Sequence, residues 1–511
     1  MLNGVNDVDS NPSVPFSDSR ERRIVWLLCL LAAAHVLVFS AAFPFFNNVD
    51  EGAHFDLVIK YSQGSIPLGL APFSAESVRY LVICGSPEYL NDPVTLVGGR
   101  FPPPVWTEPP TENTRQWLLA LGARYRAQTN HESMQPPLYY ALAGLWWHLG
   151  RGLGFEAGQL LYWLRFLNAL IIVALVWLGF ITARVVFPGR RFVQLGVPAL
   201  LAFLPQTAFY SIQNDVLLPL SFGAAFLCLV HFWRADRPGI KWGMATGLAL
   251  AATYLTKISS LPLLMVFGWA VLAEVRRLFK QGTLRPALPA LVVLLLSAGL
   301  PIGGWMMWTK HAGGDYLGTA TKIQQLGWTY KPFDEWWHHP IFTPHGMWVF
   351  TSGLLASFWR GEFTWQLQRL ALPAVDAVYV IASMLFLGVA AAALVQRFPV
   401  MCQLQRQALW FSLASFMAAM AFLGFLSVIY DFHDCFYPSR VNPFFTSGRL
   451  MLGVLIPFLL LFVYGLDRTF NCLKPAWPRW LTLAGFILFM LISEIAIDRP
   501  AFLSPYNWFH M

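Results

Sequence analysis

Residues 24–43 read IVWLLCLLAAAHVLVFSAAF, a run of 20 residues without Asp, Glu, Lys or Arg. The hydrocarbon core of a bilayer is about 30 Å thick, and an α-helix needs about 20 apolar residues to cross it. The run follows Arg20, Arg22 and Arg23, is too long for a cleaved signal peptide and has no small-residue cleavage site. We therefore predict a retained membrane span preceded by a cytoplasmic tail, residues 1–23.

The rest of the chain extends this pattern. Of 511 residues, 56% are hydrophobic and 12% are charged, whereas a soluble domain carries about 25% charged residues. We therefore expect an all-α integral membrane protein with about eleven spans. The predicted spans are 24–43, 160–183, 193–212, 216–233, 242–257, 259–275, 287–308, 371–395, 407–430, 449–466 and 480–497.

The net charge of +8 comes from basic residues whose positions indicate the membrane topology. Every second connection between spans is basic, as the positive-inside rule requires for a chain with its N-terminus inside and its C-terminus outside. This placement argues against a nucleic-acid partner. The basic residues of these connections are Arg20, Arg22, Arg23, Arg184, Arg190, Arg191, Arg234, Arg237, Lys241, Arg276, Arg277, Lys280, Arg285, Arg397, Arg406, Arg468, Lys474 and Arg479.

The long connections all fall on the outer side. They are residues 44–159, 309–370 and 431–447, and they are rich in proline and aromatic residues. Loops longer than about 15 residues usually carry function or structure of their own. We expect a transmembrane core over 24–308 that includes the first external loop, then the external loop 309–370, then C-terminal spans over 371–511.

Two external segments are expected to be helices lying in the outer interface. QPPLYYALAGLWWHLG, residues 135–150, would reach only about 20 Å as a helix, and counting it as a span would reverse the charge rule. We expect Tyr139, Tyr140, Trp146 and Trp147 to anchor it. The second interfacial helix is predicted from about 346 to 368 and contains Trp359, which could cover a lipid or stack on a sugar.

The stretch after the first span carries the first candidate site. NNVDEGAHFDLVIKYSQG, residues 47–64, would place Asp50 and His54 on one face of a helix, with Glu51 on a neighbouring face. The alternative is structural: an Asp favoured at a helix start by the helix dipole and a solvated Glu. The sequence places no carboxylate clearly at mid-bilayer, which argues against a conduction path.

Other polar residues are expected in the same outer layer. Asn214 and Asp215 follow the third span, Lys257 ends the fifth, and Arg449 begins the tenth. Lys257 could instead reach lipid phosphates, and Arg449 could simply pair with a carboxylate. Together they suit transfer from a lipid phosphate, with Asp50 as the base and Lys257 and Arg449 holding the leaving phosphate.

These residues carry a resemblance. The Asp-Glu pair after the first span, QPPLYY and the Asp after the third span resemble the GT-C fold of polyprenyl-phosphate-sugar-dependent glycosyltransferases, such as protein O-mannosyltransferases and aminoarabinose transferases. More closely still, the chain resembles a branch of bacterial predicted membrane proteins. The matching motifs are Asp50-Glu51 with His54, Lys257 before Leu261-Pro262, Ser357-Phe358-Trp359, and Gly448-Arg449.

The resemblance implies a membrane glycosyltransferase with an inverting single displacement in the bacterial inner membrane. Its partners would be a polyprenyl-phosphate-linked sugar, a glycan, lipid or protein acceptor, and membrane lipids. It implies Asp50 as catalytic aspartate, Asp215 as the acidic residue of the second external loop, and the segment from Gln135 through Tyr139 and Tyr140 as a donor-site border. The chain departs from the pattern at Gly52–Phe55, where the family has Arg-Tyr, and at Gln135, where it has a cation.

Further possibilities are left open by the sequence. A transporter for a lipid-linked saccharide, or a non-catalytic envelope-assembly protein, would use the same composition. The proposed chemistry needs no cofactor, although the external His131, Glu132 and other histidines allow a divalent cation. Cys84 and Cys435 are both external, so a disulfide between them is allowed in an oxidising compartment.

Overall fold

The computed structural model describes residues 19–89, 91–96, 99–235, 238–396, 401–435, 437–470 and 475–511. The predicted cytoplasmic tail up to residue 18, and the basic residues Arg237, Arg397 and Lys474, lie outside these ranges.

The described residues form a bundle of long apolar helices, which confirms the expected all-α integral membrane protein. Nine helical segments in the described ranges are long and apolar enough to cross a membrane. They are α1 (Ser19–Ala42), α6 (Ala157–Val186), η3 with α8 (Asn214–Val216 and Leu218–Arg234), η4 with α10 (Ile258–Ser260 and Leu261–Lys280), α11 (Leu284–Gly313), α14 (Pro373–Gln396), α15 (Gln403–Ile429), η7 with α16 (Gly448–Val454 and Leu455–Thr469), and α17 (Trp477–Leu503) with the η8 turn (Trp508–His510).

The other two predicted spans are shorter helices of the same bundle. The predicted span 193–212 is α7 (Arg191–Ala202), whose 12 residues reach only about 18 Å. It ends where the polar Gln206 and the short η2 (Thr207–Tyr210) follow. The predicted span 242–257 is α9 (Ile240–Thr256), which has 17 residues and packs between α8 and α11.

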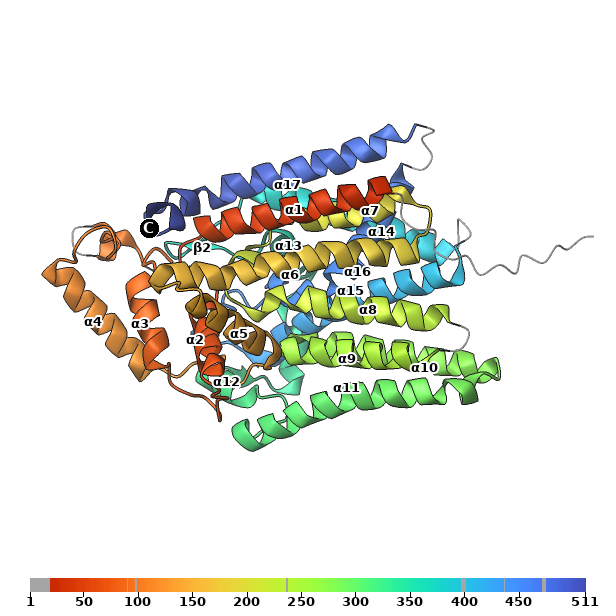
Figure 1. Cartoon of the computed structure of the whole chain (residues 1–511), viewed down its shortest axis with the longest axis horizontal. Coiled ribbons are helices and arrows are strands. Elements are labelled where there is room, and N and C mark those ends of the chain that lie inside the picture. Colours follow the sequence, from red (N-terminus) through yellow and green to blue (C-terminus); the bar gives the residue numbers. More distant parts are fainter. Residues whose placement is uncertain are drawn as a thin grey trace, which may run out of the picture.

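The chain crosses the bundle repeatedly, as the charge pattern predicts. In Figure 1 the C-terminus lies at one end of the bundle, and α1 begins at the opposite end. Helix α16 forms the centre, because nearly all of its residues are buried. On α1 many apolar residues, such as Leu27 and Leu30, are exposed, which suits a surface that faces lipid.

The external segments gather at the end of the bundle where the C-terminus lies (Figure 1). The first loop contributes α2 (Glu51–Ser62), α3 (Ala75–Cys84), η1 (Pro93–Thr95), α4 (Glu112–Ala127) and α5 (Leu138–Gly152). The second contributes α12 (Ala320–Gln325), η5 (Phe333–His338), η6 (Pro340–Phe342) and α13 (Pro344–Arg360). Two short antiparallel pairs complete this end: β1 (Thr329–Tyr330) with β4 (Tyr430–Asp431), and β2 (Thr364–Trp365) with β3 (Gln368–Arg369).

Helix α5 forms where the interfacial helix was predicted, and Leu142, Leu145 and Leu149 are exposed along one face. The prediction of aromatic anchors is wrong for three of the four residues; Trp146 is half-buried and stacks on Trp163 of α6. Tyr139, Tyr140 and Trp147 are buried, because this face packs on α2 and α6.

Helix α13 corrects the second interfacial prediction. Its C-terminal half is buried, and Trp359 is fully buried between α14, α16 and α17. The indole Nε1 donates to Ser383 Oγ (2.8 Å), and the ring stacks on Tyr379. Trp359 therefore packs in the core and does not present its ring to a sugar or lipid headgroup.

The allowed disulfide is absent. Both Cys84 and Cys435 are free thiols. Cys84, the last residue of α3, is buried in the main hydrophobic core. Cys435 follows β4 in the chain and packs with Phe432 and Trp328.

Candidate active site

Asp50 stands at the start of α2 in a strained backbone conformation. Its φ of 63° and ψ of 2° lie in the left-handed region, which is uncommon for a residue other than glycine. Strain of this kind costs about 1–3 kcal/mol and persists where the surrounding structure fixes it, often at functional sites. The Asp50 side chain is 24% exposed.

Glu51 has the opposite environment from its neighbour. Its side chain is fully buried, and Arg165 of α6 binds it through two hydrogen bonds, Nε to Oε1 and Nη2 to Oε2, both 2.8 Å. The backbone N–H groups of Phe46 and Ile212 donate to the same carboxylate. Glu51 therefore ties the start of α2 to the bundle, and these four hydrogen bonds occupy its carboxylate, although the residue also borders the cavity beside Asp50.

Arg449 links the two remaining predicted carboxylates. Its Nη2 donates to Asp50 Oδ2 (2.7 Å), and its Nη1 donates to Asp215 Oδ2 (3.3 Å) and to Gln213 Oε1 (3.1 Å). Lys257 Nζ donates to the same Asp215 Oδ2 (2.6 Å). The four charged residues predicted for the site thus form one cluster, although Asp50 and Arg449 are 399 positions apart.

Two of the short motifs explain how Arg449 is positioned. The backbone N–H of Gly448 donates to Ser357 Oγ (2.9 Å). A Cβ at position 448 would lie 2.1 Å from the backbone nitrogen of Phe358. Only glycine allows this close approach, so η7 packs on α13 and presents Arg449 to Asp50.

The loop before α5 supplies the other side of the cluster. His131 Nε2 hydrogen-bonds to Asp50 Oδ1 (3.1 Å), and Lys322 of α12 forms an ion pair with Glu132. Gln135 Nε2 donates to Glu132 Oε2 (2.6 Å), and Asn214 Nδ2 donates to Gln135 Oε1 (3.2 Å). Gln135 and Asn214 therefore lie in the cluster.

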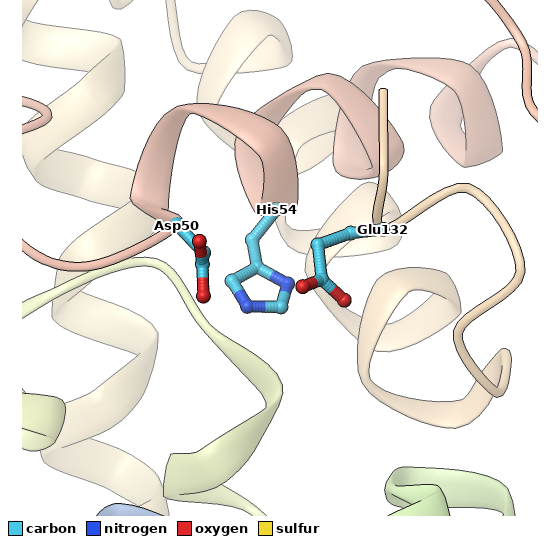
Figure 2. Close-up of side chains that lie close together, drawn as sticks. All are labelled: Asp50, His54 and Glu132. Atoms are coloured by element: carbon cyan, nitrogen blue, oxygen red, sulfur yellow. The ribbon is translucent and has the colours of Figure 1, made fainter. Parts of the chain in front are cut away.

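His54 faces the interior of this cluster. Its Nδ1 hydrogen-bonds to the Tyr140 hydroxyl (2.7 Å), whereas its buried Nε2 has no partner among the described residues. Figure 2 shows the imidazole between the carboxylates of Asp50 and Glu132. One donor atom from each of the three residues lies within 4.8 Å of the others, so together they could hold a divalent cation. Arg449 and Lys322 already neutralise the two carboxylates.

The electrostatics of the cluster favour ionised carboxylates. Burial alone would raise the pKa of Asp50, but the hydrogen bond from His131 and the charge of Arg449 outweigh it and hold this pKa well below its usual range. Burial lowers the pKa of His54 to about 4, so its imidazole is neutral at pH 7. The pKa of His131 is raised, because its bond to Asp50 outweighs its burial.

A cavity of about 590 Å³ opens beside Asp50 and His131. Its wall combines aromatic rings with side-chain amides, contributed by Phe73, Tyr89, Tyr125, Asn48, Gln128 and Gln325. Aromatic faces and amides suit a polar organic ligand with apolar faces. Tyr139 does not line this cavity; it borders an apolar groove between α5 and α6 with Leu145.

Several residues of the site escaped the sequence analysis. Glu362 lies 3.8 Å from Arg449 Nε and accepts a hydrogen bond from Ser447. Lys322 and Arg165 were not singled out either. The signal for Arg165 was present, because an arginine inside an apolar run is costly unless it has a partner.

A second cluster of ionisable groups lies inside the bundle, although the sequence predicts no carboxylate at mid-bilayer. Glu494 of α17 is buried, and its Oε2 lies 2.7 Å from His35 Nε2 of α1. Tyr210 donates to the other oxygen of Glu494, and Asp498 is buried one turn further along α17. Among the described residues, no hydrogen bond or ion pair joins Glu494 or Asp498 to the Asp50 cluster.

Comparison with known proteins gives a family and distant solved structures. Residues 34–429 match the model of a family described as predicted membrane protein (DUF2142). One of the matching solved structures is the archaeal oligosaccharyltransferase AglB from Archaeoglobus fulgidus in complex with an inhibitory peptide and a dolichol-phosphate, with 14% sequence identity and a TM-score of 0.40. The match covers 95% of this chain but only 56% of that one, so this chain spans little more than half its length. No curated protein matches the chain.

Proposed function

The chain belongs to the predicted membrane protein family DUF2142, and we propose that it transfers a sugar from a polyprenyl-phosphate donor to an acceptor hydroxyl. The reaction would take place at the outer face of a bacterial inner membrane. The observation that carries this proposal is the position of Asp50: a partly exposed carboxylate on a cavity wall, joined through Arg449 to the Asp215–Lys257 pair.

In the proposed reaction the acceptor occupies the cavity beside Asp50. Asp50 takes the proton of the acceptor hydroxyl while the acceptor oxygen attacks the anomeric carbon of the donor. The bond between that carbon and the phosphate oxygen breaks, and the electron pair leaves with the polyprenyl phosphate. One displacement inverts the anomeric configuration.

Arg449 and Lys257 would stabilise the leaving phosphate. The guanidinium can bind two phosphate oxygens at once, and the ammonium adds a point charge. In the resting protein Arg449 holds Asp50 and Asp215. A phosphate that draws Arg449 away from Asp50 would make that carboxylate more basic when the acceptor is bound, and His131 would keep it oriented.

The test is sugar transfer by the purified full chain in proteoliposomes, together with envelope glycans analysed by mass spectrometry from a deletion strain. Asp50→Asn should abolish transfer. Asp334→Asn, which changes an exposed external carboxylate in the same way, should not. Transfer by Asp50→Asn at the native rate would refute Asp50 as the base.

One observation favours transport of a lipid-linked saccharide as a second candidate. Glu494 and Asp498 are buried within a helix assigned as a span, and the side chain of His35, on another such helix, is 7% exposed. Ionisable groups in such positions often mark ion pathways. A transporter would move labelled lipid-linked sugar across vesicles without forming a glycosidic bond. Glu494→Gln would then slow this movement.

A further inference from the structure

The end of the bundle opposite the candidate active site carries a second polar cavity, of about 760 Å³. It lies among the start of α7, the end of α16 and the start of α17. Arg449 and Arg468 stand near opposite ends of the segment Gly448–Thr469, about 30 Å apart at 1.5 Å per residue. This cavity is therefore independent of the proposed transfer site.

Cationic side chains dominate this cavity. Its lining includes Arg190, Arg191, Arg468 and Arg479, with Asp467 as its carboxylate. Arg191 also pairs with Glu21 (2.9 Å), which lines the adjoining groove together with Arg20. Asp467 is shared, because Arg479 Nη1 lies 2.7 Å from its Oδ1 and Arg190 Nη1 lies 4.0 Å from its Oδ2. Arg479 Nε is buried without a hydrogen-bond partner in the part of the chain that the structure describes. The cavity thus has an excess of positive charge and donors for an anion.

An apolar groove of about 380 Å³ continues from the cationic cavity. Ile24 and Leu28 of α1 face Leu195 and Ala199 of α7 across it. Each pair is spaced i, i+4, so each follows one helix face for about 6 Å. Arg191 and Trp480 line both the cavity and the groove.

We infer that the cavity and the groove together bind one anionic phospholipid. Its phosphate would lie among the arginines, and an acyl chain would extend along the groove between α1 and α7. The charge favours this lipid over a zwitterionic one, because a quaternary ammonium would meet the same arginines. The basic end of the bundle is also the end assigned to the cytoplasm, where anionic headgroups attract basic residues.

The groove distinguishes a lipid from a free anion. Inorganic phosphate could occupy the cationic cavity but would leave the apolar groove unfilled. A phospholipid uses both parts: its acyl chain already lies in hydrocarbon, so the groove contributes van der Waals contacts that an inorganic anion cannot make.

The experiment measures lipid retention by the full chain in nanodiscs of phosphatidylcholine titrated with phosphatidylglycerol, read out by native mass spectrometry. Arg468→Gln should weaken phosphatidylglycerol binding about fivefold, the effect of about 1 kcal/mol for one basic residue near the headgroup. Arg285→Gln, an exposed arginine in the first turn of α11, should leave binding unchanged. Ala199→Trp fills the groove without changing charge and should also weaken binding.

Three results would overturn the inference. One is native-like retention of phosphatidylglycerol by both Arg468→Gln and Ala199→Trp. Another is displacement of the lipid by inorganic phosphate at equal concentration, which would reduce the site to an anion pocket. Equal retention of phosphatidylcholine by the native chain would refute the charge argument.

Discussion

Replacing Glu51 by Gln tests whether this residue anchors α2 or takes part in chemistry. The carboxylate accepts four hydrogen bonds, two from Arg165 and one each from the backbone of Phe46 and Ile212, at 2.8–3.0 Å. The amide of Gln keeps the shape but carries no charge, and its NH₂ group meets N–H donors. Arg165, 1% exposed, would be left buried without its counter-charge.

The expected cost follows from burial. Removing one partner of a buried ion pair costs about 3–5 kcal/mol, because the other charge stays uncompensated. Glu112→Gln on α4 is the matched control. Its side chain is 67% exposed and lies 3.6 Å from Arg115, so its loss should cost less than about 1 kcal/mol.

The assay is reversible unfolding of both variants in mixed detergent micelles, followed by tryptophan fluorescence. Adding Arg165→Met to Glu51→Gln should recover part of the lost stability, because the uncompensated charge is then removed. Equal free energies of unfolding for the native chain, Glu51→Gln and Glu112→Gln would refute the anchoring role. A loss of sugar transfer without a loss of stability would instead indicate that Glu51 takes part in the reaction.

Four further predictions follow from the same geometry. The folded-state pKa of His54 is about 4 and its ordinary value is 6.5, so on acidification the unfolded chain takes up this proton before the folded chain does. The free energy of unfolding should therefore fall by about 3 kcal/mol as the pH drops from 6.5 to 4. His54→Gln should remove this contribution to the pH dependence of unfolding. Arg449→Lys should lower transfer about 10²–10³-fold in proteoliposomes, because an ammonium lacks the planar fork; a native rate would contradict its role. Chelation with EDTA should leave the transfer rate unchanged, and a loss restored by Mn²⁺ would assign a metal to the three clustered donor residues. Trp359→Ala should cost about 3–5 kcal/mol of stability yet preserve sugar affinity per folded molecule, measured by binding to the purified chain.

The sequence predicted the membrane class, the order of helices and the outer position of the polar residues. These follow from local properties: the length of an apolar run and the sign of charge beside it. The same reasoning failed where a helix ended early, as at Ala202, because short polar segments such as Gln206–Ser211 fold back into the bundle.

Which charged residues form ion pairs could not be predicted from the neighbouring sequence. Asp50 and Glu51 are adjacent, and periodicity offered no way to tell which is buried. Arg165 binds Glu51, 114 positions away in the sequence, and Arg449 binds Asp50, 399 positions away. Trp359 likewise belongs to the core because α14, α16 and α17 surround it.

The amino-acid sequence by itself therefore determined the membrane class and the order of most spans, because transfer from water to lipid depends on short segments. The tertiary structure decided which of those groups meet, which carboxylate remains open to a ligand and which is paired in the interior. That choice depends on helix packing between distant segments, where one close contact such as Gly448 against Phe358 places Arg449 beside Asp50.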